Sequence, residues 1–265
     1  MRTMSSALRI VAFVGAALLL FGCSDATNPA GTDPESGNGE EAASFDSEAA
    51  PGASAEAFLD DDSFSRLHVE VDYMEGYEPT TAGLDSLKTA LEAHLSKSSI
   101  TIAAPTRVPA AGQDSYTADE VRDLEAEHRD HYTRAQSDTL RAYFLVLDGK
   151  FDEGNVVGVA YYNTSMAFFG QTIQEISSGL GSPSREKVEA TVFRHEFGHV
   201  LGLVNNGTPM QEAHQDDANG AHCTNEQCVM YYAIETTDYF SNLVNSKIPG
   251  FEEFCTKDMA AQGGG

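Results

Sequence analysis

The pattern of apolar and polar residues predicts a folded domain that begins with an alternating segment. Leu67-His-Val-Glu-Val-Asp-Tyr73 has the two-residue period of a strand with one buried face. The next segment, 80–95, changes to a helical period, because its leucines recur three or four positions apart. Further patterns predict strands over 100–108, 140–147, 156–162 and 166–169, and helices over 117–131, 182–201 and 236–244. This alternation favours an α+β fold built on a mixed twisted sheet.

The first 22 residues have the pattern of a lipoprotein signal peptide. Arg2 and Arg9 precede an apolar run over 10–21, which is too short to span a bilayer comfortably. The run leads into Leu20-Phe-Gly-Cys23, which resembles a bacterial lipobox with a bulkier residue than usual at Phe21. We expect cleavage before Cys23 and acylation of this cysteine. A plain secretory signal with an incidental cysteine is the alternative.

Residues 23–63 predict an acidic, disordered tether. After Cys23 the segment is rich in Ala, Gly, Ser, Pro, Asp and Glu, has no Lys or Arg, and is nearly free of large apolar side chains. Such a composition cannot offset the entropy lost on ordering. The composition changes at Phe64, so we expect the folded domain to occupy 64–265.

The strongly negative net charge of the chain argues against some classes of binding partner. The 265-residue chain carries a formal net charge of −25 and has a sequence pI of about 4.4. A nucleic-acid phosphate backbone would be repelled, so no nucleic acid partner is expected. The expected contacts are a protein or peptide substrate and a membrane reached through the lipid anchor only, and we expect a monomer.

The segment His195-Glu-Phe-Gly-His199 places chemistry on the predicted long helix. Histidines four positions apart project from one helix face, and two neutral imidazoles at that spacing can hold one Zn²⁺. Glu196 lies beside them and can act as a general base toward a water whose pKa zinc lowers. The alternative is a set of solvated or satisfied core side chains, but the joint pattern favours one catalytic zinc ion.

Gly202 follows His199 by three positions, and the resulting HExxHxxG pattern resembles the metzincin clan of zinc endopeptidases. That resemblance implies a sharp turn at Gly202 followed by a third metal ligand. Asn205 stands where the ligand would be, and a neutral amide is a poor zinc ligand. An ordinary helix-terminating glycine without a third ligand is the alternative.

The segment His222-Cys-Thr-Asn-Glu-Gln-Cys-Val-Met230 is similar to the archaemetzincin family. The resemblance implies that His222 is the third ligand, displaced by an insertion over 205–221, and that Met230 forms the Met-turn beneath the metal. It also implies a metzincin-like sheet, a long active-site helix and an irregular C-terminal subdomain. The rival third ligands are His214, Asp216 and Asp217.

Two further expectations come from the same resemblance. Tyr232 stands two positions after the methionine, where some metzincins carry a tyrosine that stabilises the oxyanion of a tetrahedral intermediate. An ordinary half-buried tyrosine is the alternative. Because these enzymes pair an extended substrate with a sheet edge, we expect 161–169 to provide that edge.

Three cysteines follow the signal peptide. Cys223 and Cys228 enclose a short loop, which predicts a disulfide between them in an oxidising compartment, and Cys228–Cys255 is the alternative. Archaemetzincins use further cysteines for a second, structural zinc. Only Cys255 is left here, so we expect a disulfide rather than a second metal.

These observations predict a zinc metalloendopeptidase with Glu-activated water, held outside the cytoplasm on a bacterial membrane, on its periplasmic side or at the cell surface. One alternative is a metal- or peptide-binding surface lipoprotein without turnover, against which Glu196 argues. Another is a hydrolase with a non-peptide substrate.

Overall fold

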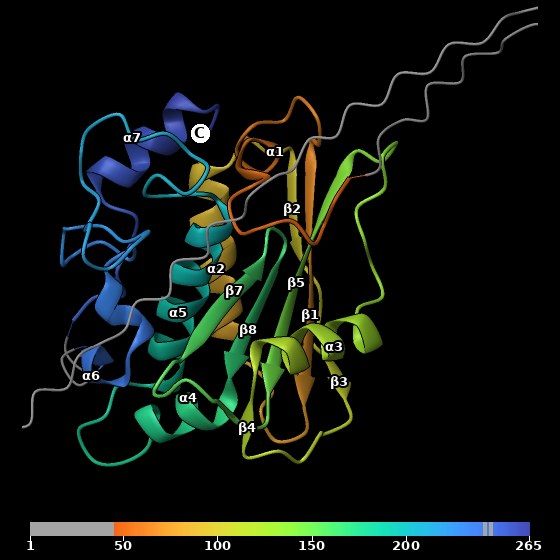
Figure 1. Ribbon diagram of the computed structural model, residues 1–265, viewed down its shortest axis with the longest axis vertical. Helices are drawn as coiled ribbons and strands as arrows, with labels where there is room; N and C mark the ends of the chain where they lie inside the picture. The colour runs from red at the N-terminus through yellow and green to blue at the C-terminus, as the bar shows by residue number, and fades with distance from the viewer. Residues whose placement is uncertain (1–44, 241–242, 244–245) are drawn as a thin grey trace, which may run out of the picture. The chain divides into compact units, whose positions relative to one another are not determined.

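The computed structural model describes residues 45–240, 243 and 246–265 (Figure 1). The predicted signal peptide, Cys23 and the predicted tether up to residue 44 lie outside the described residues. Within the described part of the chain, no helix is both long enough and apolar enough to cross a membrane.

A mostly parallel sheet forms the centre of the domain, with the strand order β2-β1-β5-β8-β7 and with β3 also paired to β1. Only the edge strand β7 is antiparallel to its neighbour, β8. The strands are β1 (Arg66–Met74), β2 (Ser99–Ile102), β3 (Thr106–Val108), β5 (Thr139–Leu147), β7 (Gly158–Tyr162) and β8 (Ser165–Phe169). A separate short pair joins β4 (Ser115–Tyr116) to β6 (Lys150–Phe151). This mixed sheet with helices packed on it confirms the predicted α+β fold class.

Both faces of the sheet are covered, because neighbouring residues of a strand point to opposite sides. Phe144 and Val146 of β5 belong to the larger core, which includes side chains of α2 (Thr81–His94) and α5 (Arg185–Val200). Tyr143 and Leu145 belong to a smaller core, which includes Val121 of α3 (Ala118–His128). The long helix α5 is therefore anchored on one face of the sheet (Figure 1).

The predicted elements agree with the structure in most places. α3 begins with a capping box, in which Thr117 and Glu120 exchange hydrogen bonds. The strand expected over 100–108 is divided into β2 and β3, and the α5 helix begins at Arg185 with Ser184 as its N-cap rather than at Ser182. Of the helix expected over 236–244, the described residues show α6 (Thr237–Phe240). The helices not predicted are α1 (Ala55–Leu59), α4 (Gly170–Ser177), the 3₁₀ helix η1 (Tyr232–Glu235) and α7 (Glu253–Ala261).

The predicted boundary at Phe64 is wrong for residues 45–63, which form part of the folded domain. Phe58 and Leu59 of α1 are fully buried, and the Phe58 ring packs edge-on against Phe197 of α5. The Asn163 side chain donates a hydrogen bond to the Ser54 hydroxyl at 2.6 Å. Average composition concealed this segment, because a few large apolar side chains within a polar stretch are enough to anchor it.

The expected substrate edge also needs a correction. Most of the expected edge, 161–169, belongs to β8, which lies inside the sheet between β5 and β7. The edge strand on this side of the sheet is β7. β7 also lies against α5. A side chain at Gly158 would collide with Val192 and Glu196 of that helix, and glycine permits this close approach.

Candidate metal centre and active site

Helix α5 carries the two histidines of the motif into the protein interior. Its N-cap Ser184 accepts a hydrogen bond from the Lys187 backbone, and almost every residue from Val188 onward is buried. His195 is fully buried and His199 is 9% exposed. Because the two residues are four positions apart, their rings meet on one face, with Nε2 atoms 3.2 Å apart.

Two glycines shape the end of this helix. A side chain at Gly198 would collide with the Met230 sulfur, so the buried Met230 lies directly against the helix between the two histidines. Gly202 has a φ of 66°, a left-handed conformation that favours glycine. A Cβ added at this position would collide with the Thr208 backbone. The chain therefore turns away from α5 at the predicted position.

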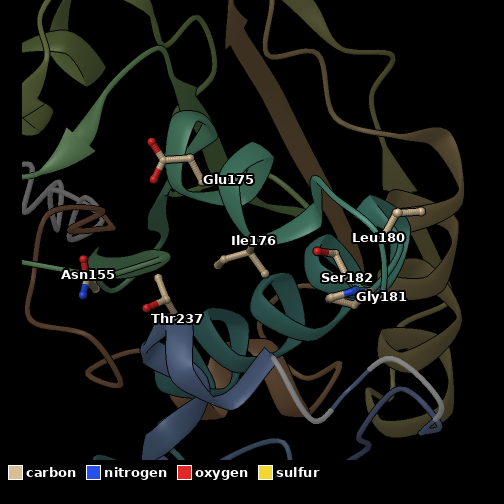
Figure 2. Close-up of a pocket in the computed structure, with 8 residues that line it drawn as sticks. Asn155, Glu175, Ile176, Leu180, Gly181, Ser182 and Thr237 are labelled. Atoms are coloured by element: carbon tan, nitrogen blue, oxygen red, sulfur yellow. The ribbon is translucent and has the colours of Figure 1, made fainter.

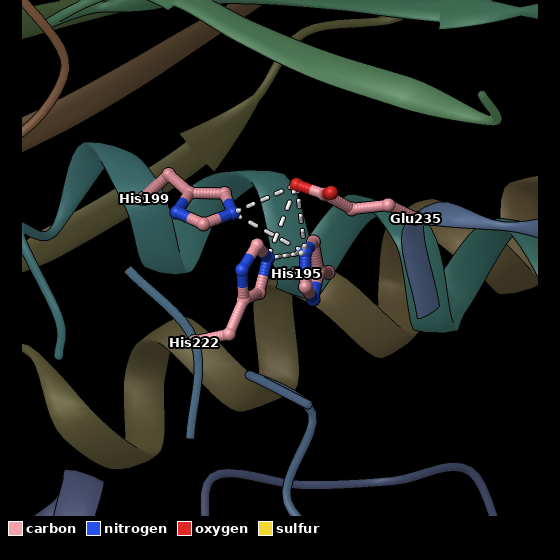
Figure 3. A group of neighbouring side chains, drawn as sticks. All are labelled: His195, His199, His222 and Glu235. Carbon is pink, nitrogen blue, oxygen red and sulfur yellow. Dashed lines mark hydrogen bonds and ion pairs between the residues drawn. The ribbon is translucent and has the colours of Figure 1, made fainter. Parts of the chain in front are cut away.

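His222 comes from the loop that follows this turn and completes a group of three imidazoles (Figure 3). Its Nε2 atom lies 3.3 Å from Nε2 of His195. Its Nδ1 atom lies 2.6 Å from the Asn219 carbonyl, and Nδ1 of His195 lies 2.6 Å from the Val229 carbonyl. A carbonyl can only accept, so both rings donate from Nδ1 and present unprotonated Nε2 atoms to one another.

The spacing of these nitrogens fits a tetrahedral zinc ion. Zinc–imidazole bonds of about 2.0–2.1 Å place neighbouring ligand atoms about 3.3–3.4 Å apart at the corners of a tetrahedron. The 3.2 and 3.3 Å separations match that edge. Burial lowers the pKa of His199 to about 4, which keeps this imidazole in the neutral form that binds metal.

Glu196 is buried beside the histidines and is held by the edge strand. The Ala160 backbone N–H of β7 donates to its Oε2 atom at 2.9 Å, whereas its Oε1 atom is buried without a hydrogen-bond partner among the described residues. Burial and the nearby Glu235 raise the pKa of Glu196 well above its ordinary value. A carboxyl with a raised pKa is suited to accept a proton and return it near neutral pH.

Glu235 is a fourth member of this group, and no sequence motif pointed to it. It is the last residue of η1, and its Oε1 atom lies 3.1 Å from Nε2 of His222, 3.5 Å from that of His199 and 3.7 Å from that of His195 (Figure 3). Although partial burial opposes the effect, the three imidazoles that face the carboxylate hold the pKa of Glu235 well below its ordinary value. Only its position five residues after Met230 could have drawn attention to it.

The other expected site residues lie elsewhere. Asp216 accepts hydrogen bonds within its own loop, from the Ala218 backbone and the Asn219 side chain, and Asp217 is exposed. The Tyr232 ring packs against Tyr231 with centroids 4.8 Å apart, and no described contact joins its hydroxyl to the three histidines. Among the described residues, the metal-capable group around these histidines contains Glu235 and neither aspartate.

His214 belongs to a second buried cluster together with the three cysteines. Its Nδ1 atom lies 3.3 Å from the Cys223 sulfur, and the sulfurs of Cys228 and Cys255 are 3.6 Å apart. The ligand atoms of His214, Cys223 and Cys255 lie within 4.8 Å of one another.

The expected disulfide is therefore wrong for this structure, since all three cysteines are free thiols. A disulfide needs its sulfurs about 2.05 Å apart, whereas two thiolates on one zinc ion, with bonds of about 2.3 Å, lie about 3.8 Å apart. The 3.6 Å separation of Cys228 and Cys255 is close to the second value. Nε2 of His214 lies 2.7 Å from the buried Asp258 carboxylate, which orients Nδ1 toward the sulfurs.

A pocket of about 280 Å³ opens onto the three-histidine group. Its lining includes Glu196, His199, His222, Glu235 and Ala160 of the edge strand. Pro51, from the segment before Phe64, also lines it and accepts a hydrogen bond from Asn206. The site therefore needs residues that the expected domain boundary excluded.

Another pocket, of about 390 Å³, lies between α4, the loop that follows it and the start of α6 (Figure 2). The carboxylate in its lining is Glu175, whose Oε2 atom is paired with the Lys150 ammonium at 2.7 Å. Its other lining side chains are apolar or uncharged. It lacks the convergent titratable groups of the three-histidine site.

Comparisons with known proteins give one kind of match. No family model matches the chain, and no curated protein matches its sequence. Among solved structures, the chain is similar to archaemetzincin from Methanopyrus kandleri, with 16% sequence identity, coverage of 76% of this chain and 96% of that chain, and a TM-score of 0.47. At this level of similarity, the roles of individual residues rest on the geometry of this chain alone.

Proposed function

We propose that the protein is a zinc-dependent endopeptidase. One observation carries the proposal: the Nε2 atoms of His195, His199 and His222 converge at zinc-ligand spacing next to the buried carboxylate of Glu196. Three imidazoles form the donor set of a hydrolytic zinc site, and the adjacent carboxylate can act as its general base. In this role zinc polarises the scissile carbonyl and lowers the pKa of the attacking water.

Glu196 is the general base in this proposal. The Ala160 N–H fixes one carboxylate oxygen, so the other, Oε1, is free to take the proton of the attacking water. The same carboxyl then returns the proton to the leaving amine. The raised pKa of Glu196 favours both transfers.

The substrate is a peptide in extended conformation. β7 is the edge strand of the sheet, runs antiparallel to β8 and contributes Val159 and Ala160 to the pocket wall, and its Ala160 N–H is already used by Glu196. A peptide that pairs with this edge places a backbone carbonyl beside Glu196, with affinity from main-chain hydrogen bonds and specificity from side-chain pockets.

The test is cleavage of casein or a quenched fluorescent peptide library by the full chain. Glu196→Gln is expected to lower the rate about 10²–10⁴-fold while the bound zinc is retained. Glu186→Gln, an exposed carboxylate in the first turn of the same helix, is the matched control and keeps wild-type activity. Equal cleavage by Glu196→Gln and wild type would refute the proposed base.

A second candidate, a metal-binding protein without turnover, is favoured by the approach of Glu235 to all three histidines. Four protein ligands are typical of structural zinc sites, whereas catalytic sites keep one position open. Zinc-loaded wild type that cleaves no peptide, alone or after substitution of Glu235, would support this candidate.

We also propose a second, structural zinc for the buried cluster, in which the ligand atoms of His214, Cys223 and Cys255 lie within 4.8 Å of one another and the Cys228 sulfur lies 3.6 Å from that of Cys255. Its members are nearly or fully buried, and His214 already has its orienting carboxylate in Asp258. A closed Cys₃His set is typical of structural zinc and stabilises the loop that presents His222.

We also propose that the protein is held outside the cytoplasm by a lipid anchor on Cys23, because the residues before this cysteine have the pattern of a lipoprotein signal peptide. Processing that is sensitive to globomycin, together with a lipid mass on Cys23, is the expected result. An unmodified cysteine at a cleaved N-terminus would contradict it.

A further inference from the structure

We propose that Glu235 is a fourth protein ligand of the three-histidine metal and that it keeps the site closed until a substrate or inhibitor displaces it. This inference rests on the proposed zinc peptidase function and adds a form of regulation to it. Its basis is the position of one carboxylate oxygen relative to three imidazole nitrogens (Figure 3).

The distances describe a four-cornered site rather than a tripod with a distant neighbour. Oε1 of Glu235 lies 3.1, 3.5 and 3.7 Å from the Nε2 atoms of His222, His199 and His195. Nε2 of His195 lies 3.2 Å from Nε2 of His199 and 3.3 Å from Nε2 of His222. All are near the edge of about 3.3–3.4 Å expected for a tetrahedron of oxygen and nitrogen ligands around zinc.

A cation explains this arrangement better than hydrogen bonds alone. Nδ1 of His195 and of His222 donates to the carbonyls of Val229 and Asn219, so their Nε2 atoms carry lone pairs. Lone pairs and a carboxylate that face one another repel. Protonation of buried imidazoles would relieve the repulsion only at a desolvation cost, whereas one divalent ion satisfies all four groups.

Glu235 closes the solvent side of the site. Its side chain is 38% exposed, compared with 0–11% for the three imidazoles, and it lines the pocket that leads to them. Catalytic zinc sites keep a position open for water or substrate, and here the Glu235 carboxylate takes that position. The resting site is therefore complete in ligands but closed to small molecules.

The backbone of Glu235 is held in place, and its side chain is 38% exposed on the solvent side. The Val157 N–H donates to the Glu235 carbonyl at 3.2 Å, and Val156 forms a bridge with Thr236. These contacts join η1 to the residues that lead into β7, the edge proposed to bind substrate. Release of the carboxylate needs only rotation of an exposed side chain, and a peptide on β7 approaches from the same side.

The test uses the full chain with cobalt(II) in place of zinc, and acetohydroxamate as the probe. Visible absorption reports the coordination of cobalt, and thiolate charge-transfer bands identify metal in the cysteine cluster separately. Glu235→Ala and the nearly isosteric Glu235→Gln are compared with wild type and with Glu226→Gln, an exposed carboxylate of a neighbouring loop. A chelator challenge of the zinc-loaded proteins gives a second readout.

The expected result is acetohydroxamate binding at least tenfold tighter in both Glu235 variants than in wild type and in Glu226→Gln. Zinc is expected to leave the histidine site at least tenfold faster in the Glu235 variants. Identical probe affinity and zinc loss in all four proteins would overturn the role of Glu235 and leave the peptidase proposal standing. Wild type that binds no metal at the histidine site would overturn both.

Discussion

Two neighbouring residues, His222 and Cys223, contribute to two clusters that differ in their exposure to solvent. Around His222, the Glu235 side chain is 38% exposed and a pocket of about 280 Å³ leads to the imidazoles. Around Cys223, the three sulfurs, His214 and Asp258 are all at most 2% exposed. The clusters also differ in donor atoms, with imidazole nitrogens and a carboxylate in the first and mainly sulfurs in the second. A substrate can therefore reach the first cluster once Glu235 moves aside, whereas the second is suited to stabilise the loop between them.

The largest effect is expected when the two loop histidines, His222 and His214, are each replaced by alanine. His222→Ala is expected to lose the accessible metal and to lower cleavage about 10³-fold or more, because the general base has no activated water. His214→Ala keeps the three-histidine metal and its activity per folded molecule. Metal analysis and peptide cleavage on both variants measure this contrast.

The opposite pattern of activity would contradict these roles for the two histidines. If His214→Ala abolished cleavage while His222→Ala did not, the catalytic metal would lie in the cysteine cluster. The placement of Asp216 and Asp217 in a hydrogen-bonded loop predicts that Asp217→Asn has wild-type metal content and activity.

The second prediction concerns stability. Cys255→Ser removes a ligand from the closed cluster and is expected to lower the free energy of unfolding by about 3 kcal/mol or more. In a domain of this size that corresponds to a fall in Tm of roughly 6–12 °C, measured by calorimetry. Ala260→Ser, at an exposed position of the same helix, is the control. A Tm unchanged in Cys255→Ser would show that the cluster holds no structural metal.

The third prediction tests the orienting carboxylate. Asp258→Asn leaves the shape of the site intact but removes the charge that faces His214 at 2.7 Å. The affinity of the closed cluster for zinc is expected to fall about 10–100-fold, as measured by competition with a chromogenic chelator. Glu253→Gln, at an exposed position of the same helix, should change nothing. Equal zinc affinity in Asp258→Asn and wild type would mean that His214 is not a ligand.

The smallest effect is expected beneath the open cluster. Gly198→Ala places a methyl group against the Met230 sulfur, and overpacking costs about 1–3 kcal/mol. The higher helix propensity of alanine offsets about 0.5–1 kcal/mol of this, so a net loss of about 1 kcal/mol is expected. Gly250→Ala is the matched control, because its added Cβ meets nothing within 4 Å, and a change of at most about 0.5 kcal/mol is expected. Denaturant unfolding measures both. Equal stability of the two variants would show that Met230 does not pack tightly under the site.

The core elements were predictable because local pattern and burial agree in them. β1, α2, α3 and β5 have periods that their buried faces impose, and the fold class follows from their order. The segment containing α1 could not be predicted from average composition, because only a few of its side chains, Phe58 and Leu59 among them, are apolar and fully buried. α4 and α7 are short and polar, so their tertiary contacts decide their structure.

The site residues also fall into those that local sequence spacing predicts and those that only the tertiary structure brings together. The spacing of His195, Glu196 and His199 on one helix is a local property, so the sequence predicts their meeting. His222 was placed through a family resemblance, and the structure brings it to the same point. Glu235, and the pairing of His214 with Asp258 44 positions away, depend on how loops fold over α5, and no local period encodes that.

The most direct test of the two-cluster account is the number of zinc ions per chain, measured by elemental mass spectrometry on full-length protein. Wild type, His222→Ala and Cys255→Ser are compared after gentle removal of loosely bound metal. The account predicts two zinc ions in wild type and one in each variant, with cleavage lost only in His222→Ala. A single zinc in wild type that both variants lose would contradict it, since His222 and Cys255 would then serve one shared site.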